Sequence, residues 1–229
     1  MIALLGAVVL TAAIAPFSSH VPGSTLPPGW RELRVARVSQ AEIALVAEEG
    51  ATVLRVRSRA SAGTAAFALH EAPPGARLSW RWKIDRVVEK ADLATKAGDD
   101  FAARVYVFFD VPMASLTWGQ RLKLRIARLV YGDEVPAASI CYVWDNRHPR
   151  GTTGWNPYTD RVRTVVVESG NERAGRWVDE TRDVEADFRA AFGASVTPRI
   201  TGIAAGNDTD QTGEEASAWF GDFRLEAVP

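Results

Sequence analysis

Short runs in which apolar and polar residues alternate make up most of the chain after Trp30. The clearest run, 78–85, reads Leu-Ser-Trp-Arg-Trp-Lys-Ile-Asp, so its large apolar side chains share one face and its polar side chains the other. This two-residue period predicts a β-strand with one face on a core. Further strands are expected at 51–57, 101–111, 140–145, 161–168, 176–184 and 220–228. Because strands and helices do not alternate regularly, a parallel α/β sheet is disfavoured.

A helix is expected over residues 116–131, where apolar positions recur at helical spacing. The apolar stripe consists of Leu122, Ile126, Leu129 and Val130, and Gly132 follows as a stop. The other side of this helix carries Arg121, Lys123, Arg125 and Arg128. Such a basic face suits contact with an anionic surface, although a solvated face is the commoner explanation.

A second, shorter helix is expected over residues 183–192. Asp183 is placed to cap its first turn, and Gly193 is placed to end it. The elements together predict an all-β-dominated fold, an antiparallel β-sandwich of jelly-roll type with two peripheral helices.

The N-terminal segment has the pattern of an export signal. Residues 2–15 are almost entirely apolar, and no residue before His20 is charged. The run is too short to cross a bilayer comfortably. Ala13 and Ala15 are small residues that suit signal cleavage after position 15. Because Pro16 disfavours cleavage at that position, cleavage after Ala13 is the alternative. A buried N-terminal helix is the alternative. We therefore expect a signal peptide at 1–15, a Pro/Ser/Gly-rich linker at 16–29, a single domain at 30–229, and a periplasmic or secreted location.

The overall composition excludes some classes of function and leaves others open. The formal net charge is −1, so no basic field recruits nucleic acid. No second apolar segment is long enough for a transmembrane span. The one cysteine, Cys141, has no partner for an internal disulfide and is expected to pack as a small hydrophobe. The oligomeric state is not indicated.

The familiar catalytic signatures are absent from the sequence. There is no Gly-x-Ser-x-Gly elbow, no His-Glu-x-x-His, no phosphate loop and no dinucleotide fingerprint. The three histidines, His20, His70 and His148, are not arranged at the spacing of metal ligands. The sequence therefore assigns no catalytic residue and leans away from an enzyme.

The strongest local signal is an acidic loop at 206–215. Asp208, Asp210 and Thr212 offer oxygens at alternate positions, and Gly213 permits a tight turn. Calcium takes six to eight hard oxygen ligands, so this loop is a candidate for a structural calcium site. An EF-hand is excluded, because Trp219 stands where the closing glutamate is required. The alternative is a plain polar turn whose Asp side chains bond their own backbone.

A second polar signal precedes the expected strand at 101–111. Asp99 and Asp100 are adjacent, and Arg104 follows four residues after Asp100, which places those two on one face of a strand. These residues are candidates for lining a polar cleft that binds a ligand. The alternative is that Asp100 anchors the loop through a salt bridge or backbone hydrogen bonds.

Aromatic residues form a third signal. The ligand candidates of this group are Tyr142, Trp144, Trp155 and Tyr158, with Arg147 beside them. Aromatic rings stack on the apolar faces of sugars while nearby polar groups bond the hydroxyls. Trp155 and Tyr158 are the better candidates, because they lie in a loop.

Several of these motifs, in this order, resemble a known family. The motifs are the segment 98–107, Tyr142-Val143-Trp144, the segment 165–170, Trp177 with Glu180, the segment 183–188 with Phe192-Gly193, and Asp208-Thr209-Asp210 before Gly221-Asp222. They resemble a bacterial exported family known only as a domain of unknown function (number three-zero-four-seven). The resemblance implies an envelope protein and supplies no catalytic residues.

The segment 218–225 is similar to the last strand of jelly-roll carbohydrate-binding modules. In those modules an Asp that enters this strand often helps to bind a structural calcium, and Asp222 matches that position. By this fold-level analogy, Asp222 joins the candidate calcium ligands.

Three functions remain open at the level of sequence. The leading expectation is an exported protein that binds a carbohydrate-like ligand, with calcium bracing the acidic loop. The second is a polysaccharide-acting hydrolase or lyase on the same scaffold, in which Asp99 or Asp100 is paired with Asp208 or Asp210 across a groove. The third is a structural envelope protein without a small ligand.

Overall fold

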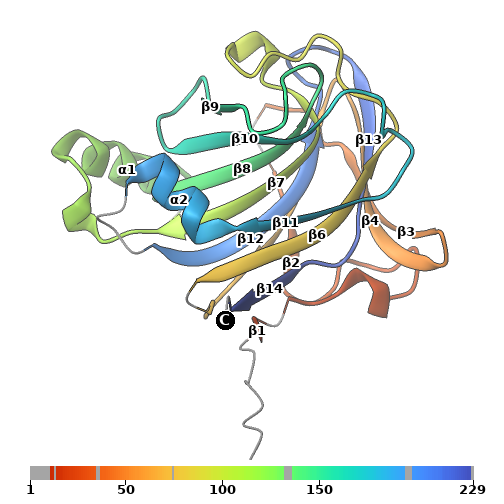
Figure 1. Ribbon diagram of the computed structural model, residues 1–229, viewed down its shortest axis with the longest axis horizontal. Coiled ribbons are helices and arrows are strands. Elements are labelled where there is room, and N and C mark those ends of the chain that lie inside the picture. Colours follow the sequence, from red (N-terminus) through yellow and green to blue (C-terminus); the bar gives the residue numbers. More distant parts are fainter. Residues whose placement is uncertain are drawn as a thin grey trace, which may run out of the picture.

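The computed structural model describes residues 11–12, 14–34, 37–73, 75–131, 136–193 and 198–227. Within these residues the chain forms two seven-stranded sheets packed face to face, with two α-helices beside them (Figure 1). This architecture confirms the predicted β-sandwich of jelly-roll type with two peripheral helices. None of the described helices is both long enough and apolar enough to span a bilayer.

Sheet A is antiparallel and centres on the strand of alternating tryptophans. Its strands are linked in the order β1 (Thr11–Ala12), β14 (Arg224–Ala227), β6 (Ala76–Ile84), β13 (Glu215–Phe220), β4 (Ala51–Arg59) and β3 (Glu42–Glu48). β13 and β14 pair one after the other with the same edge of β6, and β11 (Val178–Asp183) pairs with its opposite edge. The strand expected at 220–228 is found only at 224–227 as β14; β13 already ends at Phe220, and residues 221–223 separate the two strands.

Sheet B carries the candidate site residues. Its strands are, in spatial order, β2 (Trp30–Leu33), β5 (Ala62–Ala68), β12 (Arg199–Asp208), β7 (Phe101–Asp110), β8 (Ala138–Asp145), β10 (Val162–Ser169) and β9 (Thr153–Trp155). β8 and β10 run parallel, whereas the other strand pairs described in this sheet are antiparallel. Strands β1, β2, β3, β5, β9, β12 and β13 were not expected from the sequence pattern, apart from Phe220 at the end of β13.

The core lies between the sheets and is rich in aromatic rings. The predicted apolar face of β6 is buried, with Trp80 at 3% and Trp82 at 0% exposure. Trp80 stacks on Tyr142 of β8 with ring centroids 5.4 Å apart, and Trp82 contacts Trp144 at 5.8 Å. The alternation in the sequence therefore identified the face of sheet A that meets sheet B.

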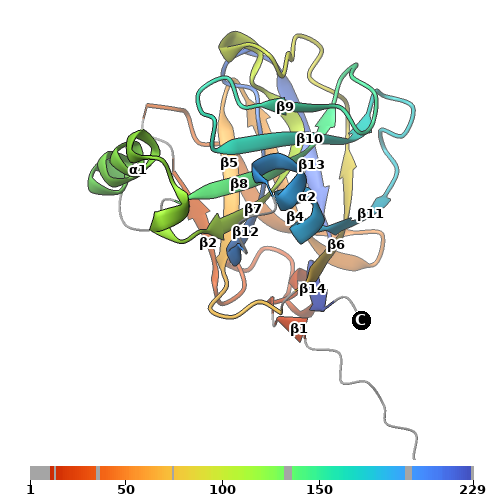
Figure 2. The same cartoon turned by 60° about the vertical axis from the view of Figure 1, so that its left-hand side comes forward.

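Helix α2 (Val184–Phe192) covers one side of the core. Asp183 caps it by accepting a hydrogen bond from the backbone N–H of Ala186 at 2.8 Å, and Gly193 ends it, as predicted. Phe188 is buried and packs on Phe109 of β7. Helix α1 (Trp118–Tyr131) instead projects from one end of sheet B (Figure 2).

The stretch expected to be a linker packs on the sandwich. Phe17, in a short 3₁₀ turn (Phe17–Ser19), is fully buried, and the centroid of its ring lies 4.7 Å from that of Trp30. The indole of Trp30 donates to the carbonyl of Ala15 at 2.9 Å. The Pro, Ser and Gly content predicted a linker, but it gave no indication that the Phe17 side chain would be buried in the core.

Candidate functional site

Asp100 holds the acidic loop in place. It lies just before β7 and is fully buried. Its carboxylate accepts hydrogen bonds from the backbone N–H groups of Thr212 at 2.6 Å and Gln211 at 3.4 Å. The backbone N–H of Gly213 bonds the carbonyl of Thr209, and Gly213 has φ = 73°, in the left-handed region that favours glycine. Asp100 therefore supports the tight turn that the sequence predicted.

Arg104 joins the two polar segments that the sequence singled out. Its guanidinium is buried and donates through Nε to Oδ1 of Asp208 at 2.8 Å, while Nη2 contacts the other oxygen of Asp208. It also donates to the backbone carbonyl of Asp99 and, at 3.0 Å, to the hydroxyl of Tyr106. Asp208 ends β12 and accepts a further bond from the backbone N–H of Phe101.

Three carboxylates meet beside this arginine. One oxygen each from Asp100, Asp208 and Asp210 lies within 4.8 Å of the others. Burial raises the pKa of Asp208 to about 7 against the lowering effect of Arg104, and Asp100 raises it further. Burial and Asp100 also raise the pKa of Asp210. The cluster therefore carries more negative charge than one guanidinium compensates, which favours either a proton or a cation there.

The donor set meets the chemistry of calcium only in part. Carboxylate oxygens are the hard ligands that calcium prefers. However, Arg104 occupies both oxygens of Asp208, and backbone N–H groups occupy both oxygens of Asp100. Asp210 has the most free capacity, since among the described residues its carboxylate meets the amide of Gln211 and its own backbone N–H but no cation at ion-pair distance. Calcium binding at this loop stays a prediction.

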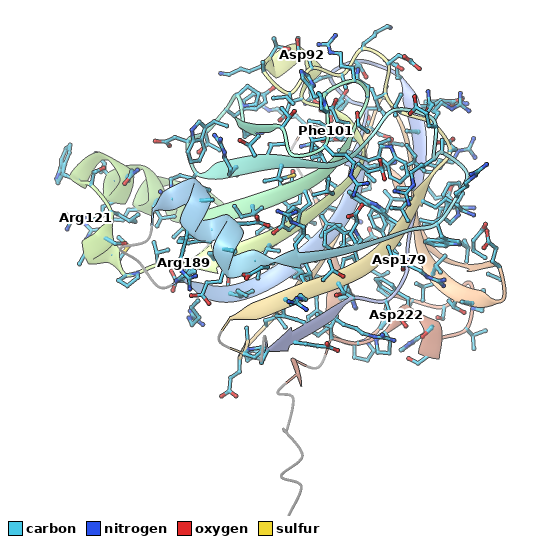
Figure 3. The ribbon with its side chains drawn as sticks, viewed as in Figure 1. Asp92, Phe101, Arg121, Asp179, Arg189 and Asp222 are labelled. Atoms are coloured by element: carbon cyan, nitrogen blue, oxygen red, sulfur yellow. The ribbon has the colours of Figure 1, made fainter. Side chains whose placement is uncertain are left out.

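Two of the expected calcium ligands take other positions. The backbone N–H of Thr212 donates to Asp100, and its hydroxyl oxygen accepts a hydrogen bond from the backbone N–H of Glu214. Asp222 lies between β13 and β14, where its carboxylate accepts bonds from the backbone N–H and hydroxyl of Ser18. Figure 3 shows Asp222 well separated from Phe101, whose N–H bonds Asp208. Asp222 therefore ties the N-terminal segment to sheet A, away from the three carboxylates.

Two of the aromatic ligand candidates belong to the core. Tyr142 and Trp144 point between the sheets and are 0% and 1% exposed. The Tyr142 hydroxyl donates to Asp187 of α2 at 2.7 Å, and the Trp144 indole donates to the carbonyl of Gly170 at 3.0 Å. A ligand on the surface does not reach either ring. Both lie on β8, and the sequence alone did not distinguish the inward face of this strand from a loop entrance.

The other two aromatic candidates lie at the rim of a groove. Trp155 is 41% and Tyr158 55% exposed. The groove has a volume of about 720 Å³ and lies between α1 and the 155–162 segment, over the start of β8. Its lining residues are Leu116, Gln120, Leu124, Pro136, Ala137, Ser139, Trp155, Asn156, Pro157, Tyr158, Thr159, Asp160, Arg161 and Val162. We call this cavity the α1 groove.

Rim residues of the α1 groove are held by polar contacts. The Tyr158 hydroxyl donates to the carbonyl of Lys96 at 3.2 Å, and the Lys96 ammonium lies 5.0 Å from the centroid of the Tyr158 ring. The amide of Asn156 donates to Asp99 at 2.8 Å. Burial raises the pKa of Asp99, while Arg104 and the bond from Asn156 lower it. Asp99 thereby connects the acidic cluster to the groove loop.

The remaining ligand candidate, Arg147, lies in the loop after β8. Its guanidinium pairs with Asp92 at 3.2 Å, and its backbone N–H bonds the buried carboxylate of Asp145. The same Asp145 oxygen accepts the backbone N–H of His148 and contacts Nδ1 of its ring at 3.0 Å. Arg147 does not line the α1 groove.

Sequence reasoning missed a second acidic pair at the open side of the sandwich. Glu168 of β10 and Glu180 of β11 are 3% and 7% exposed. The guanidinium of Arg150 lies 3.7 Å from Glu168 and 3.8 Å from Glu180, and Arg173 pairs with Glu168 at 2.6 Å. Burial raises the pKa of Glu180 to about 7, with Arg150 lowering it and Glu168 raising it. Both residues belong to the motifs that carry the family resemblance, Glu168 near the end of an apolar run and Glu180 in the polar segment Val178–Asp183, but neither position by itself indicates a buried pair.

Comparison with family models identifies the chain. Residues 28–224 match the model of the family described as "Protein of unknown function (DUF3047)". The chain belongs to this family. The match covers most of the sequence and confirms the resemblance carried by its motifs. Comparison with curated proteins finds no match.

Solved structures similar to this member of the DUF3047 family are distant in sequence. A family 11 carbohydrate-binding module from Clostridium thermocellum, in complex with a β-1,3-1,4-mixed-linked tetrasaccharide, is 6% identical, with 97% of this chain and 98% of that chain covered and a TM-score of 0.44. The K3 cleaved adhesin domain of Lys-gingipain from Porphyromonas gingivalis is 9% identical (96% and 98% covered; TM-score 0.40). The cellulose induced protein Cip1 is 13% identical (87% and 91% covered; TM-score 0.41).

Proposed function

We propose that this protein is an exported binding protein for a carbohydrate-like ligand and that the α1 groove is its binding site. The observation that carries the proposal is a groove of about 720 Å³ with two exposed aromatic side chains, Trp155 and Tyr158, at its rim. Cavities of this size hold small ligands, and loops on a rigid sheet are common places for binding residues.

The chemistry of the α1 groove suits a sugar. Aromatic rings offer apolar faces to the C–H groups of a sugar ring, whereas amides, carboxylates and guanidinia bond its hydroxyls. The groove supplies the second kind of group through Asn156, Asp160 and Arg161. The Arg161 side chain is already positioned, because its Nε donates to the carbonyl of Ala137 at 2.6 Å.

The positions of the four candidate carboxylates give less support to the alternative, a polysaccharide-acting enzyme. Asp99 and Asp100 do lie near Asp208 and Asp210, but Asp100 and Asp208 are engaged with backbone N–H groups and Arg104. None of the four lines the α1 groove. A pair that works on a glycosidic bond has to flank that bond from an open site.

A glycan screen with groove variants tests the proposal. The intact chain is expected to bind one class of glycan, and Trp155→Ala and Tyr158→Ala are each expected to weaken that binding about tenfold or more, since buried aromatic contacts dominate binding energies. Tyr158→Phe keeps the ring and serves as the matched control. Val21→Ala, at an exposed position outside the groove, is the surface control.

Two outcomes would count against the α1 groove. A folded protein with a normal melting curve that binds no glycan would contradict carbohydrate binding itself. Glycan binding that is unchanged in both ring deletions would place the site elsewhere on the molecule. Isothermal titration at one fixed salt concentration separates these outcomes.

A calcium ion among Asp100, Asp208 and Asp210 is a second part of the proposal. It would offset the excess negative charge beside Arg104 and brace the turn at 209–213. Because Asp99 bonds Asn156, a braced acidic loop would also steady one wall of the α1 groove. An extracytoplasmic location would supply the calcium that a weak loop site requires.

A further inference from the structure

Helix α1 turns an apolar face away from the protein. Leu124 is 9% exposed and lines the α1 groove together with Gln120, which identifies the side that meets the sandwich. Trp118 and Leu122, by contrast, are 75% and 43% exposed. They are four residues apart and so share one face of the helix. The sequence pattern placed Leu122 in an apolar stripe with Ile126, Leu129 and Val130, whose side chains lie outside the described part of the structure. Leu122 itself is exposed, and Leu116 and Leu124 are buried beside the groove instead.

The same helix is strongly basic. Residues 118–131 contain Arg121, Lys123, Arg125 and Arg128 and no acidic residue, whereas the whole chain has a formal net charge of −1. The neighbouring acidic residues in the sequence, Asp110 and Asp133, lie outside the helix. At 100° per residue, Arg121 and Arg125 lie beside the face of Trp118 and Leu122, both on the side next to Trp118. Figure 3 shows Arg121 at the outer end of the molecule.

An exposed apolar face beside positive charge matches one kind of partner. Short amphipathic helices with Trp and Leu on one face and Lys or Arg around it lie in the plane of a membrane interface. Trp settles at the level of the headgroups, and each basic residue near an anionic surface adds attraction. A merely solvated basic face would explain the arginines, but it gives no reason for Trp118 to be exposed.

A second copy of the chain is a poorer occupant of this face. Two-fold pairing of α1 with itself would bring Arg121 and Arg125 of one helix against the same residues of the other. Like charges that face each other across an interface oppose association. The helix contains no acidic residue that could form the complementary pair.

We propose that α1 docks this protein on an anionic lipid bilayer. Trp118 and Leu122 enter the headgroup region, and Arg121 and Arg125 contact lipid phosphates. The α1 groove opens beside the same helix, so docking holds the groove close to the membrane surface. This proposal is independent of the ligand in the groove.

Vesicle co-sedimentation of the full chain tests the docking. Vesicles of phosphatidylcholine alone are compared with vesicles that contain phosphatidylglycerol in a ratio of about one in three. Any vesicle binding through the apolar residues 2–13 is expected to be alike for both kinds of vesicle, because these residues carry no charge. Binding that depends on phosphatidylglycerol therefore reports the basic helix, and it is expected to fall steeply with added salt.

Two double variants separate the apolar and the electrostatic contribution. Trp118→Ser with Leu122→Ser, and Arg121→Glu with Arg125→Glu, are each expected to lower the affinity for the anionic vesicles about tenfold or more. Val21→Ser and Arg57→Glu are the matched controls, since both positions are exposed and lie outside α1. The controls are expected to keep wild-type binding.

Three results would overturn the proposal. The first is equal binding to both kinds of vesicle, and the second is a lipid preference that survives both double variants. The third is a change of oligomeric state by light scattering in the Trp118 and Leu122 variant without a change in vesicle binding, which would assign the face to a second copy. Melting curves of each variant confirm that the sandwich is folded, and glycan titrations report the groove separately.

Discussion

Arg104 of β7 and Asp208 of β12 form a buried ion pair, with Nε of the arginine 2.8 Å from Oδ1 of the aspartate. The pair connects the loop before β7 with the acidic loop after β12, and 104 residues separate the two partners in the chain. Burial opposes the charged form of Arg104, but Asp208 overcomes this and holds the pKa of Arg104 well above its usual value. Arg104 therefore remains a cation at any pH at which the protein is folded.

Removing this cation should destabilise the protein strongly. Arg104→Met leaves Asp208 buried without its partner, a change that typically costs about 3–5 kcal/mol. The free energy of unfolding in urea measures the loss. Arg104→Met combined with Asp208→Asn should lose less than the sum of the single variants, because no unpaired charge remains. The exposed Arg57→Met should stay within about 0.5 kcal/mol of the parent. Additive single and double variants would contradict the pairing.

Calcium should raise the melting temperature through Asp210. At a calcium concentration ten times the dissociation constant, mass action adds about 1.4 kcal/mol, which corresponds to a few degrees for a domain of this size. Asp210→Asn should remove the shift and leave the Arg104–Asp208 pair intact. Asp179→Asn, an exposed carboxylate on β11, is the matched control. No shift between chelator and 10 mM calcium (roughly the upper end for weak extracellular sites) would leave the loop as a plain turn.

Glu180 should make stability fall as the pH rises through the neutral range. Its folded pKa of about 7 lies above the ordinary value of 4.5, so between these values the folded state binds the extra proton. The extra proton on Glu180 therefore adds to the free energy of unfolding below about pH 4.5. This stabilisation, on the order of 2 kcal/mol, is lost progressively as the pH rises to about 7. Urea melts at pH 5 and pH 8 measure it.

Glu180→Gln tests the assignment to this residue. The variant should reduce the decline between pH 5 and pH 8, because its amide does not titrate, whereas Asp208, whose pKa burial also raises to about 7, still contributes to the decline. Glu215→Gln is the control, since Glu215 pairs with Arg59 at the surface. An unchanged pH profile in Glu180→Gln would show that another group titrates.

After signal removal, the N-terminal segment should still pack on the sandwich from Ile14 onward, whereas β1 (Thr11–Ala12) would leave with the signal. Ile14 is 8% exposed, and the carbonyl of Ala15 accepts the indole N–H of Trp30. Cleavage after Ala13 keeps these contacts, whereas cleavage after Ala15 removes them. We therefore expect the exported protein to begin at Ile14 by intact-mass measurement. Phe17→Ala should cost about 3–5 kcal/mol, as large-to-small changes in a core do; a start at Pro16 together with an unaltered Phe17→Ala variant would contradict this role.

Local periodicity explains which parts of the fold were predictable. The run 78–85 follows the two-residue period closely because one face of β6 meets the core and the other meets solvent. β12 was missed because its sequence contains Gly202, Ala204, Ala205 and Gly206, which have low strand propensity. The glycines are required there by space: a Cβ at Gly206 would lie 2.2 Å from the carbonyl oxygen of Gly63 on β5.

The candidate site was predictable only where its residues are neighbours in the chain. Trp155 and Tyr158 were identified because one short loop carries both, and the turn at 209–213 was identified by its Asp, Thr and Gly residues. Its support by Asp100 depends on a contact across 112 residues. The α1 groove likewise requires α1 to stand opposite the 155–162 segment, which no local pattern specifies. Tyr142 and Trp144 were misplaced because only their partners, Trp80 and Trp82, reveal which face of β8 is inward.

The last strands of the chain occupy the middle of both sheets. β12 lies between β5 and β7 in sheet B, and β13 lies between β4 and β6 in sheet A. Until residues 199–220 have been synthesised, neither sheet has its central member, and the strands on either side lack a hydrogen-bonding neighbour. Pairings that span so much of the chain form slowly. We therefore expect the sandwich to fold only after residues 199–220 have been synthesised, and not strand by strand as the chain emerges.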